Sequence, residues 1–312
     1  MQDVGSPQMS SRTTIRVGAR PSPLSLAQTE EVLALLRAAY PDCEFVVVPI
    51  STQGDREKDA PLLSLGRGMF VKDIERALEA REIDVAVHSA KDLAPEIPAG
   101  MGVTSVGKRG DPRDVLINKW RLKLLELPPG ARIGTSSPRR MAQIRIKRPD
   151  LTLLEIRGNV GTRIEKSGGD DYDGVVLAAA GLARLGRNSE ITEYFEADFF
   201  TPDSGQGILA AEARADDTAI LDMLNKVQHG PTANAFAAER SFLGALGGGC
   251  KVPVAAHARQ EGSMVHISAM AALPDGSRIF RARIRWSARD AANGGRRIAE
   301  DLLNNGAKEI LS

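Results

Sequence analysis

The sequence has little of what marks a secreted, membrane or metal-binding protein. Its 312 residues include two cysteines, Cys43 and Cys250, which are too few for a disulfide framework and indicate a reducing, cytosolic setting. No run approaches the roughly 20 apolar residues of a membrane span. Residues 1–12 lack the apolar core of a signal peptide, so we expect a disordered tail there. No metal-ligand spacing is present, and no metal is expected.

An excess of charge of one sign is also missing. Lys and Arg number 41 against 40 Asp and Glu, and the net charge of +1 gives no general attraction to nucleic acid or to a membrane surface. Any affinity for anions must therefore come from a local cluster. The 42% hydrophobic and 26% charged residues are typical of a soluble protein, and the length suffices for two or three domains.

Short apolar strands alternate with amphipathic helices over the first 180 residues, which predicts two α/β units with mostly parallel sheets. The first unit is expected to contain strands 14–18, 44–50 and 84–88 and helices 25–40 and 69–81. The second is expected to contain strands 114–117, 132–134, 152–156 and 174–178 and helices 138–147 and 160–166. The units join near residues 106–113, and the segment 199–213 is interpreted as a return crossing.

The pattern changes after Pro231. One helix, 232–246, is followed by strands 252–259, 264–272 and 278–286 and a last helix, 290–305. The turns between these strands, Gln-Glu-Gly-Ser and Pro-Asp-Gly-Ser, favour hairpins. This part predicts a small antiparallel sheet with helices on it, an α+β unit.

Polar and basic residues follow most of the predicted strands of the two α/β units. They are Arg20 and Ser22, Lys91 and Asp92, Thr135 to Arg140, Arg157 and Arg163, and Arg184. In open α/β sheets the ligand lies beyond the carboxyl ends of the strands, so we expect these loops to face one basic cleft. A solvated basic surface explains any single arginine equally well, but it explains five such loops poorly.

Thr135-Ser136-Ser137-Pro138 has the features of a helix start, with hydroxyl caps and a proline in the first turn. Arg139 and Arg140 follow directly, although a helix N-terminus prefers anions. An anionic ligand would relieve this conflict. Because guanidinium groups bind carboxylates and phosphates bidentately, the sequence predicts a ligand with several such groups.

Three further side chains near this cleft have alternative interpretations. Asp92 could pair with a cationic nitrogen and assist a leaving amine, or it could only neutralise Lys91. Cys250 follows three glycines and could be an attachment point, although most free cysteines are small buried hydrophobes. His88 is interpreted as a core residue.

Eight motifs in the same order identify a resemblance. They are Arg-x-Ser-Pro-Leu at 20–24, Gly-Met-Phe-Val-Lys at 68–72, His-Ser-x-Lys-Asp at 88–92, Gly-Thr-Ser-Ser-x-Arg-Arg at 134–140, Ile-Arg-Gly-Asn-Val-x-Thr-Arg at 156–163, Ala-x-Ala-Gly-Leu-x-Arg-Leu at 178–185, Gly-Gln-Gly at 205–207 and Gly-Gly-Cys-x-Val-Pro at 248–253. With these motifs the chain resembles the porphobilinogen deaminase family, also called hydroxymethylbilane synthases, from Thr13 to its C-terminal helix.

The resemblance implies a transferase that joins four porphobilinogen molecules head to tail, releases ammonia and hydrolyses the product, hydroxymethylbilane, from the enzyme. The chain grows on a covalent dipyrromethane primer, whose thioether sulfur would be that of Cys250. Asp92 would be the catalytic carboxylate that contacts pyrrole nitrogens, assists loss of ammonia and stabilises a cationic azafulvene. The residues that would hold the primer are Lys91, Asp92, Thr135, Ser137, Arg139 and Arg140. Those that would line the site of substrate and growing chain are Arg20, Ser22, Gln28, Arg157, Arg163 and Arg184.

The fold implied is α/β, with two domains of mixed sheets like those of periplasmic binding proteins and a small α+β third domain that has a three-stranded antiparallel sheet. We expect domain 1 to comprise 13–107 and 208–228, domain 2 to comprise 108–207, and domain 3, with Cys250, to comprise 229–312. The resemblance also implies a cytoplasmic monomer with uroporphyrinogen-III synthase as a downstream partner.

This chain departs from the family pattern in the loop 51–67, where Ser64 stands in place of a frequent lysine and one residue is missing before Arg67. In addition, Pro95 is shifted by one position, and Gly247 replaces a common glutamate. None of these changes removes a catalytic group.

Two rival functions rank lower. A periplasmic binding module would share the fold and the arginines but would need a signal peptide and would have no use for Cys250. A cysteine hydrolase would need a base near the thiol, and His257 is expected only to alternate with alanines in a strand.

Overall fold

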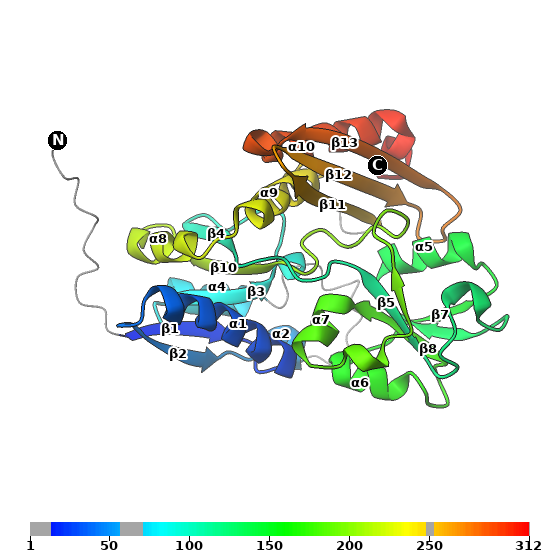
Figure 1. Ribbon diagram of the computed structural model, residues 1–312, viewed down its shortest axis with the longest axis horizontal. Coiled ribbons are helices and arrows are strands. Elements are labelled where there is room, and N and C mark those ends of the chain that lie inside the picture. The colour runs from blue at the N-terminus through cyan, green and yellow to red at the C-terminus, as the bar shows by residue number, and fades with distance from the viewer. Residues whose placement is uncertain (1–13, 57–70, 248–252, 312) are drawn as a thin grey trace.

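The computed structural model describes residues 14–56, 71–247 and 253–311. The tail predicted for 1–12, the loop positions Ser64 and Arg67, and Cys250 itself lie outside these residues. Three sheets organise the described chain, and Figure 1 shows two α/β units side by side with the third sheet lying across them.

The first sheet has five strands in the order β2-β1-β3-β10-β4. Its strands are β1 (Thr14–Ala19), β2 (Glu44–Pro49), β3 (Val85–Ser89), β4 (Met101–Val106) and β10 (Leu209–Arg214). Its helices are α1 (Pro23–Ala39), α2 (Gln53–Arg56), α4 (Lys72–Glu79) and α8 (Thr218–Lys226). The first three strands are parallel, and β10 is antiparallel to both β3 and β4, so the sheet is mixed.

The second sheet has the order β7-β6-β8-β5-β9 and is also mixed. Its strands are β5 (Asp114–Asn118), β6 (Arg132–Gly134), β7 (Thr152–Leu154), β8 (Gly174–Ala178) and β9 (Glu193–Phe195). Its helices are α5 (Pro138–Lys147), α6 (Val160–Lys166) and α7 (Ala179–Arg184), with short 3₁₀ turns at Leu124–Glu126 and Asn188–Glu190.

The third sheet is antiparallel in the order β11-β12-β13. Its elements are α9 (Gly230–Ala245), β11 (Val254–Glu261), β12 (Met264–Ala272), β13 (Ile279–Ser287), a 3₁₀ turn (Ala288–Asp290), α10 (Ala291–Leu302), a π-helical turn (Leu303–Ala307) and α11 (Lys308–Leu311). One face packs on α9 and α10 in a core that includes Phe242, Ile267 and Ile298. The predicted class, two α/β units with mixed sheets and a small α+β unit, is confirmed.

The sequence pattern missed the strands β4, β9 and β10 and the helices α2, α8 and α11. It predicts a crossing over 199–213, yet the last part of this segment belongs to β10. This strand, Leu-Ala-Ala-Glu-Ala-Arg, is buried at every position and rich in alanine. Because both of its faces are covered, it shows no alternation of apolar and polar residues, and its composition does not favour a strand.

The two crossings between the α/β units run side by side. Gly110 donates its backbone N–H to the carbonyl of Gly207 at 3.1 Å, and the Gln206 amide donates to the carbonyl of Pro112 at 2.7 Å. Arg109 and Glu239 form a buried ion pair of 2.6 Å that ties the crossings to α9. The third unit is therefore fastened to the point where the other two units meet.

Candidate active site

The carboxyl end of β3 carries the predicted catalytic carboxylate. A 3₁₀ turn, Ala90–Asp92, follows β3 directly, and Ala90 donates its N–H to the carbonyl of Ile208 at 3.0 Å. Gly205, with a φ of +79°, passes so close that a Cβ would lie 2.8 Å from the backbone nitrogen of Lys91. Only glycine permits this approach, and the contact fixes the turn that presents Asp92.

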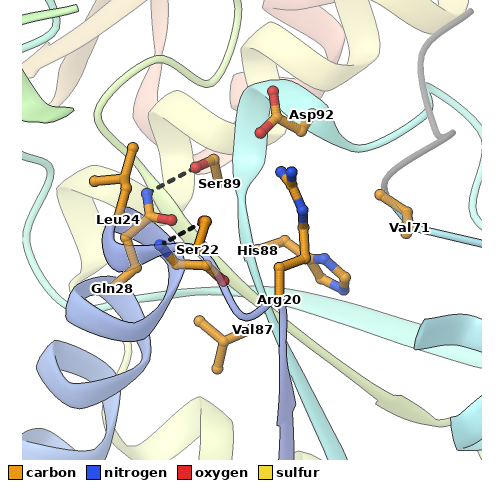
Figure 2. Close-up of a pocket in the computed structure, with 10 residues that line it drawn as sticks. Arg20, Ser22, Leu24, Gln28, Val71, Val87, His88, Ser89 and Asp92 are labelled. Atoms are coloured by element: carbon orange, nitrogen blue, oxygen red, sulfur yellow. Dashed lines mark hydrogen bonds between the residues drawn. The ribbon is translucent and has the colours of Figure 1, made fainter. Parts of the chain in front are cut away.

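Asp92 lines a pocket together with three of the residues predicted to bind substrate: Arg20, Ser22 and Gln28. Figure 2 shows Arg20 extending toward Asp92, and the Gln28 amide donating to the Ser89 hydroxyl at 2.7 Å. The Ser22 hydroxyl caps α1 by accepting the N–H of Ser25. Asp92 itself accepts no hydrogen bond and forms no ion pair with any residue that the structure describes.

Lys91 does not pair with Asp92 within the described residues, so the interpretation of Asp92 as its salt-bridge partner finds no support. Burial lowers the pKa of Lys91, while the charge of Asp92 opposes that change. Burial also lowers the pKa of Arg163 to about 10; Arg140 and Arg157 add to this effect, and Asp92 again opposes it. Asp92 of the first unit and Arg140 and Arg163 of the second therefore lie close enough for their charges to influence one another.

The second unit contributes the hydroxyl and arginine cluster at the start of α5. The Ser137 hydroxyl accepts the N–H of Arg140 as the helix cap, and Thr135 is buried, with its hydroxyl accepting the N–H of Ser137. Arg139 and Arg140 are 4% and 6% exposed. The structure thus confirms the helix start predicted from the sequence.

The charge conflict at this helix start is relieved by a residue that the sequence analysis did not single out. Asp114, 0% exposed at the start of β5, lies 2.7 Å from Arg139 Nη1 and 2.7 Å from Arg140 Nη2, and accepts the Gln206 amide at 3.0 Å. Burial alone would raise the pKa of Asp114, but the charges of the two arginines outweigh it and hold that pKa well below its usual range. The sequence signal for this role of Asp114 is an acidic residue at the start of an apolar strand, Asp-Val-Leu-Ile.

A sharp turn separates Arg157, which follows β7, from Arg163 on α6. Gly158 has a φ of +114°, and a Cβ there would lie 2.7 Å from Thr162. Asn159 caps α6, and Arg163 Nε donates to the carbonyl of Gly158 at 2.8 Å. Arg157 pairs with Glu155 at 3.0 Å.

Arg184 is directed to a partner in the other unit. Its Nε lies 2.7 Å from Glu31 of α1, and its Nη2 donates to the carbonyl of Gly207 at 3.2 Å. Arg20 likewise has an acidic partner, Asp55. Within the described residues, Lys91 and Arg163 are therefore the predicted ligand cations without an acidic side chain in contact.

The cleft suits a ligand that carries several carboxylates. Arg139 Nε is a buried donor with no hydrogen-bond partner among the described residues, and Lys91 and Arg163 add two cations without acidic partners. Ala255 of β11 packs with Ala142 of α5, the helix that carries Arg139. These features fit the carboxylate arms of a dipyrromethane group.

No group of three His, Cys, Asp or Glu side chains in the described ranges could hold a metal ion. Burial lowers the pKa of His257 to about 3, with Arg109 and Arg259 adding to the effect, so its imidazole is a weak base.

Among the helices of residues 14–56, 71–247 and 253–311, none is long and apolar enough to cross a bilayer.

The structural likenesses to solved proteins are weak. A YaeC-family lipoprotein from Enterococcus faecalis has a TM-score of 0.42 at 12% identity, covering 69% of this chain and 90% of the lipoprotein. The aliphatic sulphonate binding protein SsuA from Escherichia coli has a TM-score of 0.40 at 13% identity, covering 70% and 69%. Likenesses of this size support no inference about function.

Sequence comparison is decisive. A family model described as porphobilinogen deaminase, dipyromethane cofactor binding domain, matches residues 15–222, and the C-terminal domain model of the same family matches 233–304. The porphobilinogen deaminase of Alkaliphilus metalliredigens is 44% identical over 299 residues, covering 96% of this chain and 95% of the relative. That of Roseiflexus castenholzii is 45% identical over 302 residues, covering 96% and 99%. The chain belongs to the porphobilinogen deaminase family.

Proposed function

We propose that this protein is a transferase that joins four porphobilinogen molecules head to tail with release of ammonia, and then hydrolyses the linear product, hydroxymethylbilane, from the enzyme. The observation that carries the proposal is the position of Asp92. Its carboxylate lines a pocket and has no partner in the described chain, and it influences Lys91 and Arg163, which have no acidic partner either. Such a cleft binds carboxylate arms and leaves one carboxylate available to a cationic nitrogen.

A covalent dipyrromethane, attached to Cys250 through a thioether, would be held by Lys91, Thr135, Ser137, Arg139 and Arg140. When bound, this group supplies the pyrrole carbon to which the first porphobilinogen is joined. The buried Nε–H of Arg139 is suited to donate to a ligand carboxylate, because it is otherwise left without a partner in the described chain. Asp114 pairs with both arginines and offsets the repulsion between their charges.

Asp92 would act on the incoming porphobilinogen. Ionised, it accepts a hydrogen bond from the pyrrole N–H and stabilises the positive charge that develops on the ring as the carbon–nitrogen bond breaks and ammonia leaves with the electron pair. The walls of the pocket, with Arg20, Ser22 and Gln28, would orient the substrate.

Arg157, Arg163 and Arg184 would bind the growing chain. Arg163 is the strongest candidate of the three, because its charge is partly desolvated and no acidic residue of the described chain neutralises it. At Arg184 a ligand carboxylate would have to replace Glu31.

The same proposal covers the organisation and setting of the protein. The positions of the three sheets support division into 13–107 with 208–228, 108–207 and 229–312. We further propose a cytoplasmic monomer whose product passes to uroporphyrinogen-III synthase, with no nucleic acid or membrane as partner.

Intact-mass spectrometry of the purified protein tests the proposal. Protein from cells that make porphobilinogen should exceed the mass of the bare chain by two linked pyrrole units, and should release ammonia from added porphobilinogen. Cys250→Ala should have the bare mass and no activity, whereas Cys43→Ala should retain both the added mass and the activity. Parent protein with the bare mass and without turnover would refute the proposal.

A further inference from the structure

One arginine that lines the pocket is held by a carboxylate of the protein itself. Arg20 donates from Nε to both oxygens of Asp55 at 3.2 Å, and from Nη2 to Oδ1. Thr52, which is fully buried, donates to the same carboxylate from its N–H at 3.1 Å and from its hydroxyl at 2.7 Å. Asp55 therefore binds the Arg20 guanidinium along the edge formed by Nε and Nη2.

The contact follows from the arrangement of the strands. β1 and β2 are parallel neighbours with Ala19 opposite Pro49, so the residues beyond their carboxyl ends emerge side by side. The N–H of Gln53 donates to Asp73 at 2.6 Å, which fastens the short helix α2 to α4. Burial would raise the pKa of Asp55, but the hydrogen bonds from Arg20 and Thr52 outweigh it and lower that pKa, so the carboxylate is ionised at neutral pH.

We propose that Asp55 is a positioning residue, which holds Arg20 by its Nε–Nη2 edge so that the terminal edge of the guanidinium meets a carboxylate arm of the incoming porphobilinogen. This rests on the proposed function. Figure 2 shows Arg20 extending across the pocket toward Asp92, beside Ser22 and Gln28. A long arginine side chain loses rotamer freedom when it binds a ligand, and Asp55 removes that freedom before the substrate arrives.

The Asp55 carboxylate could act on Arg20 in two opposing ways. The direction in which substrate affinity changes when Asp55 is removed distinguishes them. If Asp55 positions Arg20, its removal weakens substrate binding. If Asp55 chiefly competes with the substrate carboxylate for the guanidinium, its removal strengthens binding. Asp55→Ala removes both the charge and the acceptor, whereas Asp55→Asn removes the charge and keeps an oxygen that Arg20 can use.

Steady-state kinetics of the holoenzyme with porphobilinogen decide the question. Asp55→Ala should raise KM about ten-fold, the size of one lost charged contact, and leave kcat within about two-fold. Asp55→Asn should raise KM less than Asp55→Ala. In an Arg20→Leu background, adding Asp55→Ala should change KM little, because the positioned group is already absent.

Glu30→Ala is the matched control, since Glu30 pairs with Arg37 on the exposed face of α1 and should leave KM unchanged. Circular dichroism and the intact mass confirm that each variant folds and carries the primer. A lower KM in Asp55→Ala than in the parent would overturn the positioning role. So would an Asp55→Ala substitution that raises KM equally in the parent and in the Arg20→Leu background. Absence of turnover in the parent would instead refute the proposed function and this inference with it.

Discussion

Replacement of Asp114 by asparagine should lower the free energy of unfolding by about 3–5 kcal/mol, the usual loss when one partner of a buried ion pair is removed. The side chain is 0% exposed and compensates Arg139 and Arg140, which are 4% and 6% exposed. Asparagine has the same shape but no charge. Two guanidinium groups would then remain in the interior without the carboxylate that contacts them.

The remaining contacts place the loss toward the lower end of that range. Arg139 keeps its hydrogen bond to the carbonyl of Thr201, and Arg140 keeps its bond to the carbonyl of Val176. These carbonyls share part of the positive charge but do not neutralise it. We therefore expect about 3 kcal/mol rather than 5.

The effect should depend on pH in a defined direction. The pKa of Asp114 is lower in the folded than in the unfolded protein, so its contribution to stability is complete above the unfolded value of about 4 and is lost as the pH falls through the folded value. The difference between parent and variant should therefore be constant between about pH 5 and 8 and shrink below about pH 4.

Urea unfolding followed by circular dichroism measures this difference. Both proteins should carry Cys250→Ala, so that a bound primer makes no contribution to stability. Asp150→Asn is the control, because Asp150 pairs with Arg148 in the same unit at the surface and should change stability little. A variant at position 114 within about 1 kcal/mol of the parent would show that the arginines do not depend on this carboxylate.

Three other predictions concern the cleft and the third sheet. Asp92→Asn should fold and carry the primer but lose about 10²-fold or more in single-turnover release of ammonia, with Asp92→Glu less impaired; parental turnover in the asparagine variant would show that the charge is unnecessary. Arg163→Leu should raise KM for porphobilinogen more than Arg184→Leu, because Arg184 already has Glu31 as a partner; the reverse order in steady-state assays would contradict this ranking. The imidazole of His257 should stay neutral down to about pH 3, since burial lowers its pKa, and the fold should lose stability as the pH falls below the ordinary value of 6.5; an NMR titration midpoint near 6.5 would be inconsistent with the burial.

The family, and those elements whose signals come from neighbouring residues, could be predicted from the sequence alone. The start of α5 could be read from Ser137 and Pro138, because capping and proline preferences depend only on neighbouring residues. The three strands of the third sheet could be predicted from their alternation and hairpin turns, since one face packs on α9 and α10 and alternate residues of β13 are exposed. The ordered motifs identified the family, and the sequence comparisons confirmed it.

The pairing of charges could not be predicted from the sequence, because it depends on how distant segments pack. Asp114 lies 25 residues before Arg139 in the chain, and Glu31 lies 153 residues before Arg184. No sequence periodicity connects such distant residues. They pair because the strand ends and crossings that carry them pack against one another. The insertion of β10 between β3 and β4 was hidden for a related reason, because a strand buried on both faces has no alternation. The sequence does not show whether an arginine has an acidic partner inside the protein. In the structure Arg139 and Arg140 are buried against Asp114, whereas Arg163 contacts no acidic side chain of the described chain.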